Sequence, residues 1–143
     1  MRFMMIVIPK GYEKAKPGVM PDAKLVAEMS KYNESLQKAG VLLSMEGLHP
    51  PSMGARVSYS GGKPKVMDGP YAEAKEVIGG FWMIEVRSKA EAVEWAKRAP
   101  MPDNELIEIR QVQEFEDFPA DVQKAAASEP AIRAALEKKA KKR

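Results

Sequence analysis

The sequence has 143 residues, of which 45% are hydrophobic and 30% charged, and this size and balance predict one main globular domain with a buried core. It contains no cysteine and a single histidine, His49, which excludes disulfide bonds, cysteine nucleophiles and multi-histidine zinc sites. The formal net charge is +3, no apolar run approaches the roughly 20 residues of a membrane helix, and no cleavage pattern follows the apolar start. We therefore expect a cytoplasmic protein that does not enter a membrane.

The first part of the chain predicts a strand followed by a helix. Residues 2–8 form a run that is apolar on both faces, as in a strand buried on both sides. After a loop rich in Lys, Gly and Pro, Pro21 and Asp22 open a helix that Gly40 ends. One face of this helix carries apolar residues at helical spacing, namely Leu25, Met29, Tyr32 and Leu36.

The middle of the chain predicts strands separated by turn residues. Strands are expected over residues 41–48, which His49-Pro50-Pro51 ends, and over residues 55–60. A Gly-Gly turn then leads to a short extended segment, residues 65–67. The aromatic and branched residues 81–87, preceded by Gly79 and Gly80, predict a further strand.

The last part of the chain predicts a helix, a strand and a helical tail. Ser88 and Glu91 form a capping box that starts a helix reaching about Ala99, with small residues on its inner face. Residues 105–112 alternate as in a strand, and residues 121–127 and 130–142 predict two further helical segments.

This order of elements predicts an α+β fold of the ferredoxin-like type. Two halves of this kind give an open antiparallel sheet with both helices on one face. Apolar residues on the other face, including Phe81 and Met83, require a cover, and a second copy of the chain fits this requirement best. We therefore expect residues 1–115 to form a homodimeric domain, and residues 116–143 a helical extension.

The positive charge of the chain lies at its C-terminal end. Residues 131–143 carry a net charge of +5, whereas the first 130 residues carry −2. Cations in the last turns of a helix are favoured by the helix dipole, and no aromatic residues are interleaved with them. A solvated helix end therefore explains the charge better than nucleic-acid binding does.

A nine-residue motif, Asp68-Gly69-Pro70-Tyr71-Ala72-Glu73-Ala74-Lys75-Glu76, resembles the YCII-related (DGPF-domain) family. The Gly-Gly-Phe-Trp run that ends at Trp82 and the Gly-Leu-His-Pro run that contains His49 fit the same pattern, whereas Tyr71 departs from it, because the family name implies Phe. The resemblance spans residues 1 to about 112 and implies a dimeric α/β barrel. It also implies a suspected His-Asp catalytic pair, here His49 and Asp68, and relatives that act on chlorinated aromatic compounds or accompany sigma-factor-like regulators.

The residues themselves leave the role of this pair open. A histidine exchanges protons readily near neutral pH, and a carboxylate bonded to one ring nitrogen would fix its tautomer, which suits a general acid or base. Alternatively, His49 satisfies backbone groups at a strand end, and Asp68 caps the turn that Gly69 and Pro70 form.

Four further residues are candidate substrate contacts. Tyr71 and Trp82 could stack on a flat ligand or be core residues, and Glu73 and Lys75 could face a pocket or form a solvated turn. No dinucleotide or phosphate-binding loop occurs, and the ten methionines fit core packing better than a metal site, so we expect neither cofactor nor metal. Two functions remain: a cofactor-independent enzyme acting on an aromatic or other small molecule by proton transfer or elimination, and a non-catalytic small-molecule-binding or regulatory homodimer.

Overall fold

A computed structural model describes residues 1–141, and the chain divides into two compact units, Met1–Gln111 and Val112–Arg143. The first unit contains six strands, two α-helices and two short 3-10 turns. In chain order they are β1 (Arg2–Ile8), η1 (Tyr12–Lys14), α1 (Ala23–Lys38), β2 (Leu42–Gly47), η2 (Pro51–Met53), β3 (Ala55–Ser60), β4 (Lys63–Asp68), β5 (Gly80–Glu85), α2 (Lys89–Lys97) and β6 (Leu106–Gln111).

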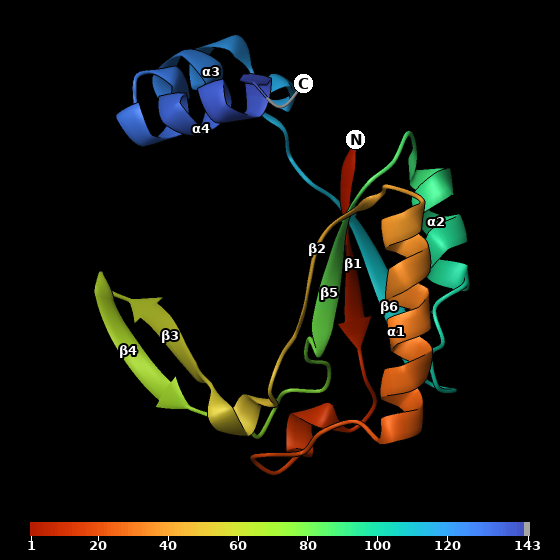
Figure 1. The fold of residues 1–143 in the computed structure, drawn as a ribbon. Helices are drawn as coiled ribbons and strands as arrows, with labels where there is room; N and C mark the ends of the chain where they lie inside the picture. The colour runs from red at the N-terminus through yellow and green to blue at the C-terminus, as the bar shows by residue number, and fades with distance from the viewer. Residues whose placement is uncertain (142–143) are drawn as a thin grey trace. The chain divides into compact units, whose positions relative to one another are not determined.

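Four of the strands form one antiparallel sheet in the order β2-β5-β1-β6. Helices α1 and α2 both lie against one face of this sheet (Figure 1). A central strand flanked by antiparallel neighbours, with crossover helices on one side, is the ferredoxin-like arrangement. The predicted α+β fold is thus confirmed.

Helix α1 begins and ends where its sequence requires. The Asp22 carboxylate accepts a hydrogen bond of 2.7 Å from the Leu25 backbone N–H, which satisfies one of the unpaired donors of the first turn. At the other end Gly40 has φ of 71°, a left-handed conformation that stops the helix at low cost only for glycine.

The core lies between the two helices and the sheet. Tyr32 and Leu36 of α1 are buried there beside Trp82 and Ile84 of β5. The Tyr32 hydroxyl donates a 2.7 Å hydrogen bond to the Trp95 carbonyl in α2, so it is paired although buried. Its ring meets the Trp82 ring edge to face, with centroids 5.3 Å apart, a favourable aromatic geometry.

Helix α2 starts at the predicted Ser88 cap, whose hydroxyl accepts a hydrogen bond of 3.2 Å from the Glu91 N–H. The reciprocal bond differs from the expected capping box, because the Glu91 carboxylate accepts from the Arg87 N–H and not from the cap residue. The helix is also shorter than predicted and ends at Lys97. Trp95 adds a large buried side chain among the small residues expected to face the sheet.

Two predicted strands do not join the sheet. β3 and the predicted extended segment, lengthened to β4, pair only with each other and form a two-stranded ribbon. All twelve residues of these two strands are exposed. The sequence indicated where the strands lie but not that a separate ribbon would be inserted between β2 and β5.

The second face of the sheet carries no helix of this unit (Figure 1). The strand register places Met4 beside Met83, and Ile6 beside Phe81, on this face. Ile6 is buried but lies outside the core cluster beneath the helices. We call this surface the open face.

The second unit contains η3 (Phe115–Asp117), α3 (Ala120–Ala127) and α4 (Pro130–Lys141). Inside it, Lys139 forms an ion pair with Glu114, and the Gln123 side-chain amide donates to the Phe118 carbonyl at 2.8 Å. The two predicted helical segments are both present. Lys142, the predicted last helical residue, and Arg143 lie outside the described residues. Within residues 1–141, none of the helices combines the length and apolar character needed to span a bilayer.

Tyr32 should make stability depend on alkaline pH. Burial raises the pKa of Tyr32 to about 12 from the ordinary 10.0, although the Arg98 charge opposes the shift. An unfolded tyrosine loses its proton near pH 10, so the contribution of Tyr32 to the free energy of unfolding should be complete below pH 10 and decline as the pH rises toward 12. Tyr32→Phe should remove this decline and cost about 1 kcal/mol at pH 7, where the Trp95 carbonyl loses its donor.

Urea unfolding of the wild type and Tyr32→Phe between pH 8 and 11.5 measures the difference. Tyr59→Phe is the matched control, because Tyr59 is 77% exposed. This substitution should change neither the free energy of unfolding at pH 7 nor its decline at alkaline pH. Parallel declines in wild type and Tyr32→Phe would contradict the prediction.

Candidate functional site

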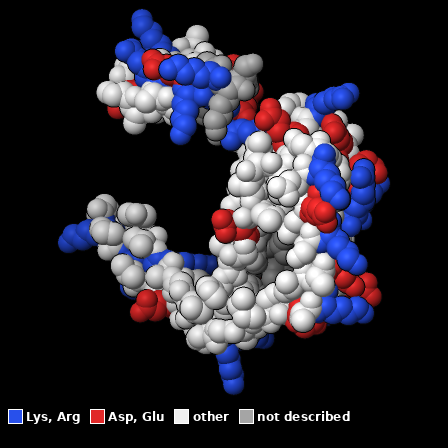
Figure 2. Space-filling model, viewed as in Figure 1, with Lys and Arg blue, Asp and Glu red and all other residues white. Residues whose placement is uncertain are grey.

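A cavity of about 660 Å³ opens between the first half of α1, the loop before it and one end of the sheet. Most of its wall is apolar, with Leu25, Val26 and Met29 from α1 facing Met45 and Trp82 from the sheet. In Figure 2 charged side chains gather over α1 and α2, while the surface over β1, β2 and β5 is mostly uncharged. The size and lining of the cavity suit a small, largely apolar molecule.

Two adjacent glycines close the end of the sheet at this cavity. Gly79 donates to the Val7 carbonyl at 2.8 Å and accepts from the Leu48 N–H at 2.9 Å, which joins three strand ends. A Cβ on Gly80 would lie 2.8 Å from the Glu46 carbonyl oxygen, and one on Gly79 would lie 2.8 Å from Pro9. The absence of both side chains therefore lets the Glu46 backbone approach Gly80 and the Pro9 ring approach Gly79, and this shapes the cavity wall.

His49 follows β2 and lines the cavity. The preceding residue is held by Tyr12, whose hydroxyl donates to the Leu48 carbonyl, and the following Pro50 is buried. Burial raises the pKa of the Tyr12 phenol above its ordinary value, so this group remains a proton donor at neutral pH. Within residues 1–141 the exposed His49 ring has no hydrogen-bond or ion-pair partner, so it is not occupied in capping backbone groups.

Asp68 is the last residue of β4 and lies opposite Ala55. It is exposed, does not line the large cavity, and its carboxylate has no partner among the described residues. The predicted cap of the following turn is therefore not formed. The peptide bond between Gly69 and Pro70 is cis.

The segment after Asp68 nevertheless packs against the turn after His49. Gly69 donates to the Gly54 carbonyl at 3.0 Å. A Cβ on Gly69 would lie only 1.8 Å from the Pro51 carbonyl oxygen, so no other residue fits this contact without movement. The structure thus brings the two segments together, while the His49 and Asp68 side chains do not bond to each other.

The four predicted substrate contacts lie in different places. Trp82 lines the cavity from its buried position and donates from its indole N–H to the Asn33 side-chain carbonyl at 2.7 Å. Tyr71 lies under the Arg56 guanidinium, 3.9 Å from its ring centroid. Glu73 and Lys75 are exposed and border a separate shallow depression. Of the predicted site residues, only His49 and Trp82 line the main cavity.

Several cavity residues were not identified as site residues from the sequence. The spacing of Leu25 and Met29 predicts that they lie on one apolar face of the helix, but it does not show where the packing of that face against the sheet ends. Asn33 gave a usable signal, since it follows Met29 by one helical turn and places an amide beside an apolar face. Among residues 1–141, no cluster of three or more acidic or histidine side chains is arranged to hold a metal ion.

The chain is similar to a known protein family and to a curated protein. The profile of the YCII-related domain family matches residues 1–116. An uncharacterized protein of Rhizobium meliloti (strain 1021), R00369, is 34% identical over 76 residues, which cover 53% of this chain. The aligned segment spans 61% of that relative's length.

Gly69 should tolerate no side chain. Gly69→Ala forces a Cβ into the Pro51 carbonyl and should lower the free energy of unfolding by about 2 kcal/mol or more, the cost of overpacking. Gly54→Ala is the matched control across the same contact, because its Cβ would meet the Pro51 oxygen at an ordinary 3.7 Å. Urea unfolding compares the two variants, and equal losses would show that the close approach does not constrain this joint.

Proposed function

Because the chain belongs to the YCII-related domain family, whose profile spans every cavity-lining residue, we propose that it binds a small apolar or aromatic molecule and transfers a proton to or from it without a cofactor. The observation that supports this proposal is the single histidine at the wall of an apolar cavity of about 660 Å³. Clefts of roughly 300–1,000 Å³ with few polar groups are typical of small-molecule sites.

His49 is the proposed general acid or base. Its ring is exposed and unbonded, and Tyr12 fixes the adjoining backbone through the Leu48 carbonyl. A positioned imidazole of this kind contributes about 10²- to 10⁴-fold to a proton-transfer rate. Trp82 supplies a flat wall on which an aromatic substrate can stack.

Asp68 is the proposed orienting residue. Its segment contacts the turn after His49 through Gly69, and neither side chain is held elsewhere. Catalytic hydrogen bonds are often long before the substrate binds, so a ligand that closes the cavity would complete the pair. In this proposal Tyr71, Glu73 and Lys75 contact substrate only after such closure, because none of them lines the cavity beforehand.

A non-catalytic binding module is the second candidate function. The observation that favours it is that His49 and Asp68 do not form a pair in the structure. Asp68 does not line the cavity, and the two side chains are not bonded to each other. In that case the cavity binds its ligand and His49 contributes only a polar contact. The two functions differ in whether a bound molecule exchanges a proton.

We further propose that the protein acts as a homodimer in the cytoplasm. The lack of cysteine is consistent with that compartment. On the open face, Met4, Ile6, Phe81 and Met83 form a continuous apolar strip across β1 and β5. Such a strip on one face of a sheet is typical of an interface.

The single imidazole allows a direct test of the proposed catalysis. Its NMR signal is unambiguous, so a panel of small aromatic ketones and acids with exchangeable C–H groups can be screened for compounds that shift it. For such a compound, deuterium exchange catalysed by the wild type should fall about 100-fold in His49→Gln and less in Asp68→Asn. Both variants should keep the free energy of unfolding within about 0.5 kcal/mol, because both positions are exposed and unbonded.

Binding without exchange would establish the second candidate function. Undiminished exchange in His49→Gln would exclude this histidine as the acid or base. Lys89→Gln is the control, because this exposed side chain at the start of α2 does not line the cavity and should leave the histidine shift unchanged.

The dimer is tested separately by light scattering, which should give twice the 15.8 kDa chain mass at micromolar concentration. Met83→Asp should convert the protein to the monomer, because it places a charge in the apolar strip. Glu94→Lys on the helix-covered side should leave the dimer intact. A wild-type monomer would contradict the dimer proposal.

A further inference from the structure

We propose that the β3–β4 ribbon is a dimerisation arm whose apolar face packs on the open face of a second copy of the chain. The inference rests on the proposed homodimer and adds which segment of each copy completes the interface. It starts from the apolar side chains on one face of the ribbon, which are exposed.

The ribbon has one apolar and one basic face. Residues opposite each other in an antiparallel pair share a face, and the register pairs Val57 with Val66 and Tyr59 with Pro64. The other face is mostly basic and polar. It consists of three pairs, Arg56 with Met67, Ser58 with Lys65 and Ser60 with Lys63.

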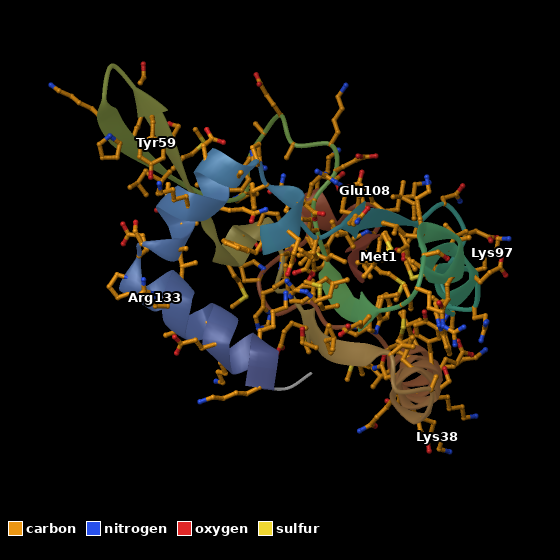
Figure 3. The ribbon with its side chains drawn as sticks, turned by 90° about the horizontal axis from the view of Figure 1, so that it is seen from above. Met1, Lys38, Tyr59, Lys97, Glu108 and Arg133 are labelled. Carbon is orange, nitrogen blue, oxygen red and sulfur yellow. The ribbon has the colours of Figure 1, made fainter. Side chains whose placement is uncertain are left out.

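No part of the first unit covers the apolar face of the ribbon. Val57 is 48% exposed, Val66 67% and Tyr59 77%. Figure 3 labels Tyr59 on the ribbon, which extends away from the four-stranded sheet. An isolated two-stranded hairpin is at best marginally stable in water, so this ribbon requires a surface on which to pack.

The open face supplies a surface of matching character. Met4, Phe81 and Met83 are only half-buried there, and Leu106 at the edge strand is 44% exposed. A six-residue strand is about 20 Å long, which is enough to cross several strands spaced about 5 Å apart. One ribbon can therefore cover much of the apolar strip.

A second copy is the occupant that satisfies both surfaces. Every chain carries one ribbon and one open face, so a twofold axis pairs the ribbon of each copy with the face of the other and leaves neither apolar surface uncovered. A partner of a different kind would have to supply two separate apolar surfaces to achieve the same result. The geometry thus favours reciprocal exchange of the arms.

The cations of the ribbon lie away from the proposed contact. Arg56, Lys63 and Lys65 are all on the face opposite Val57 and Tyr59, so docking of the apolar face leaves these charges in solvent.

Docking of the arm would also change the surroundings of the proposed site. Asp68 lies opposite Ala55 on the apolar face of the ribbon, at its base. A second copy seated on that face would shield Asp68 from solvent. The exchanged arm therefore links assembly to the carboxylate proposed to orient His49.

Light scattering of ribbon variants tests the arm, with Val57→Asp and Tyr59→Asp compared with Ser58→Asp and Ser60→Asp. All four positions are exposed, so the folded chain should tolerate each change. The first two should raise the dimer dissociation constant about 100-fold or more, because each places a charge in the interface twice per dimer. The two control substitutions lie on the opposite face of the ribbon and should change the dimer dissociation constant less than 5-fold.

Cysteine cross-linking gives an independent readout, because the chain has no cysteine of its own. Mixed Tyr59→Cys and Met83→Cys proteins should form a disulfide-linked heterodimer under mild oxidation, whereas Ser60→Cys and Met83→Cys should not.

The outcomes separate the arm from the dimer. If the wild type is a dimer that Met83→Asp disrupts, but Val57→Asp and Tyr59→Asp do not, the proposed packing of the ribbon on the second copy is wrong. The proposed homodimer is then still supported. A wild-type monomer overturns both. If the chain binds a duplex DNA oligonucleotide, and Lys63→Ala with Lys65→Ala abolishes that binding while the apolar-face variants leave the dimer unchanged, the ribbon is a nucleic-acid element and the inference is overturned.

Discussion

The packing of Trp82 between α1 and the sheet determines where the core ends and the cavity begins. The indole is 5% exposed, meets Tyr32 edge to face and donates its N–H to Asn33. In the C-terminal half of α1, Tyr32 and Leu36 are buried. In the N-terminal half, Leu25 is half-buried and Val26 is 47% exposed. The same helix therefore stabilises the fold with one half and forms a cavity wall with the other, and the hydrogen bond to Asn33 satisfies the indole at the boundary.

The elements of the fold were accessible from sequence because local chemistry determines them. β1 and β3 have the predicted bounds, and α1 begins beside the predicted Asp22 cap. The ends of the other strands differ from the predicted ends by one or two residues, because hydrogen bonding to neighbouring strands determines where a strand ends. The separation of the ribbon from the sheet was not accessible, since alternation identifies a strand but carries no information about its partner.

The site was only partly predictable for a related reason. His49 could be singled out because it is the only imidazole, and Trp82 because aromatic residues recur at ligand sites. Their meeting in one cavity depends on how far α1 stays in contact with β5, which helical spacing alone does not reveal. Tyr71 instead lies beside Arg56, a contact between residues separated by the whole ribbon.

The Asp-Gly-Pro motif has a different physical basis from the turn chemistry that its composition indicates. The Asp68 carboxylate caps no backbone group, whereas Gly69 lies where a Cβ would overlap the Pro51 carbonyl. The glycine is thus required by a long-range contact between the base of the ribbon and the turn that follows His49. Because the Gly54 carbonyl in that turn also accepts a hydrogen bond from Gly69, the base of the ribbon is joined to the segment that follows His49. The Asp-Gly-Pro motif therefore connects the ribbon to the backbone beside the cavity.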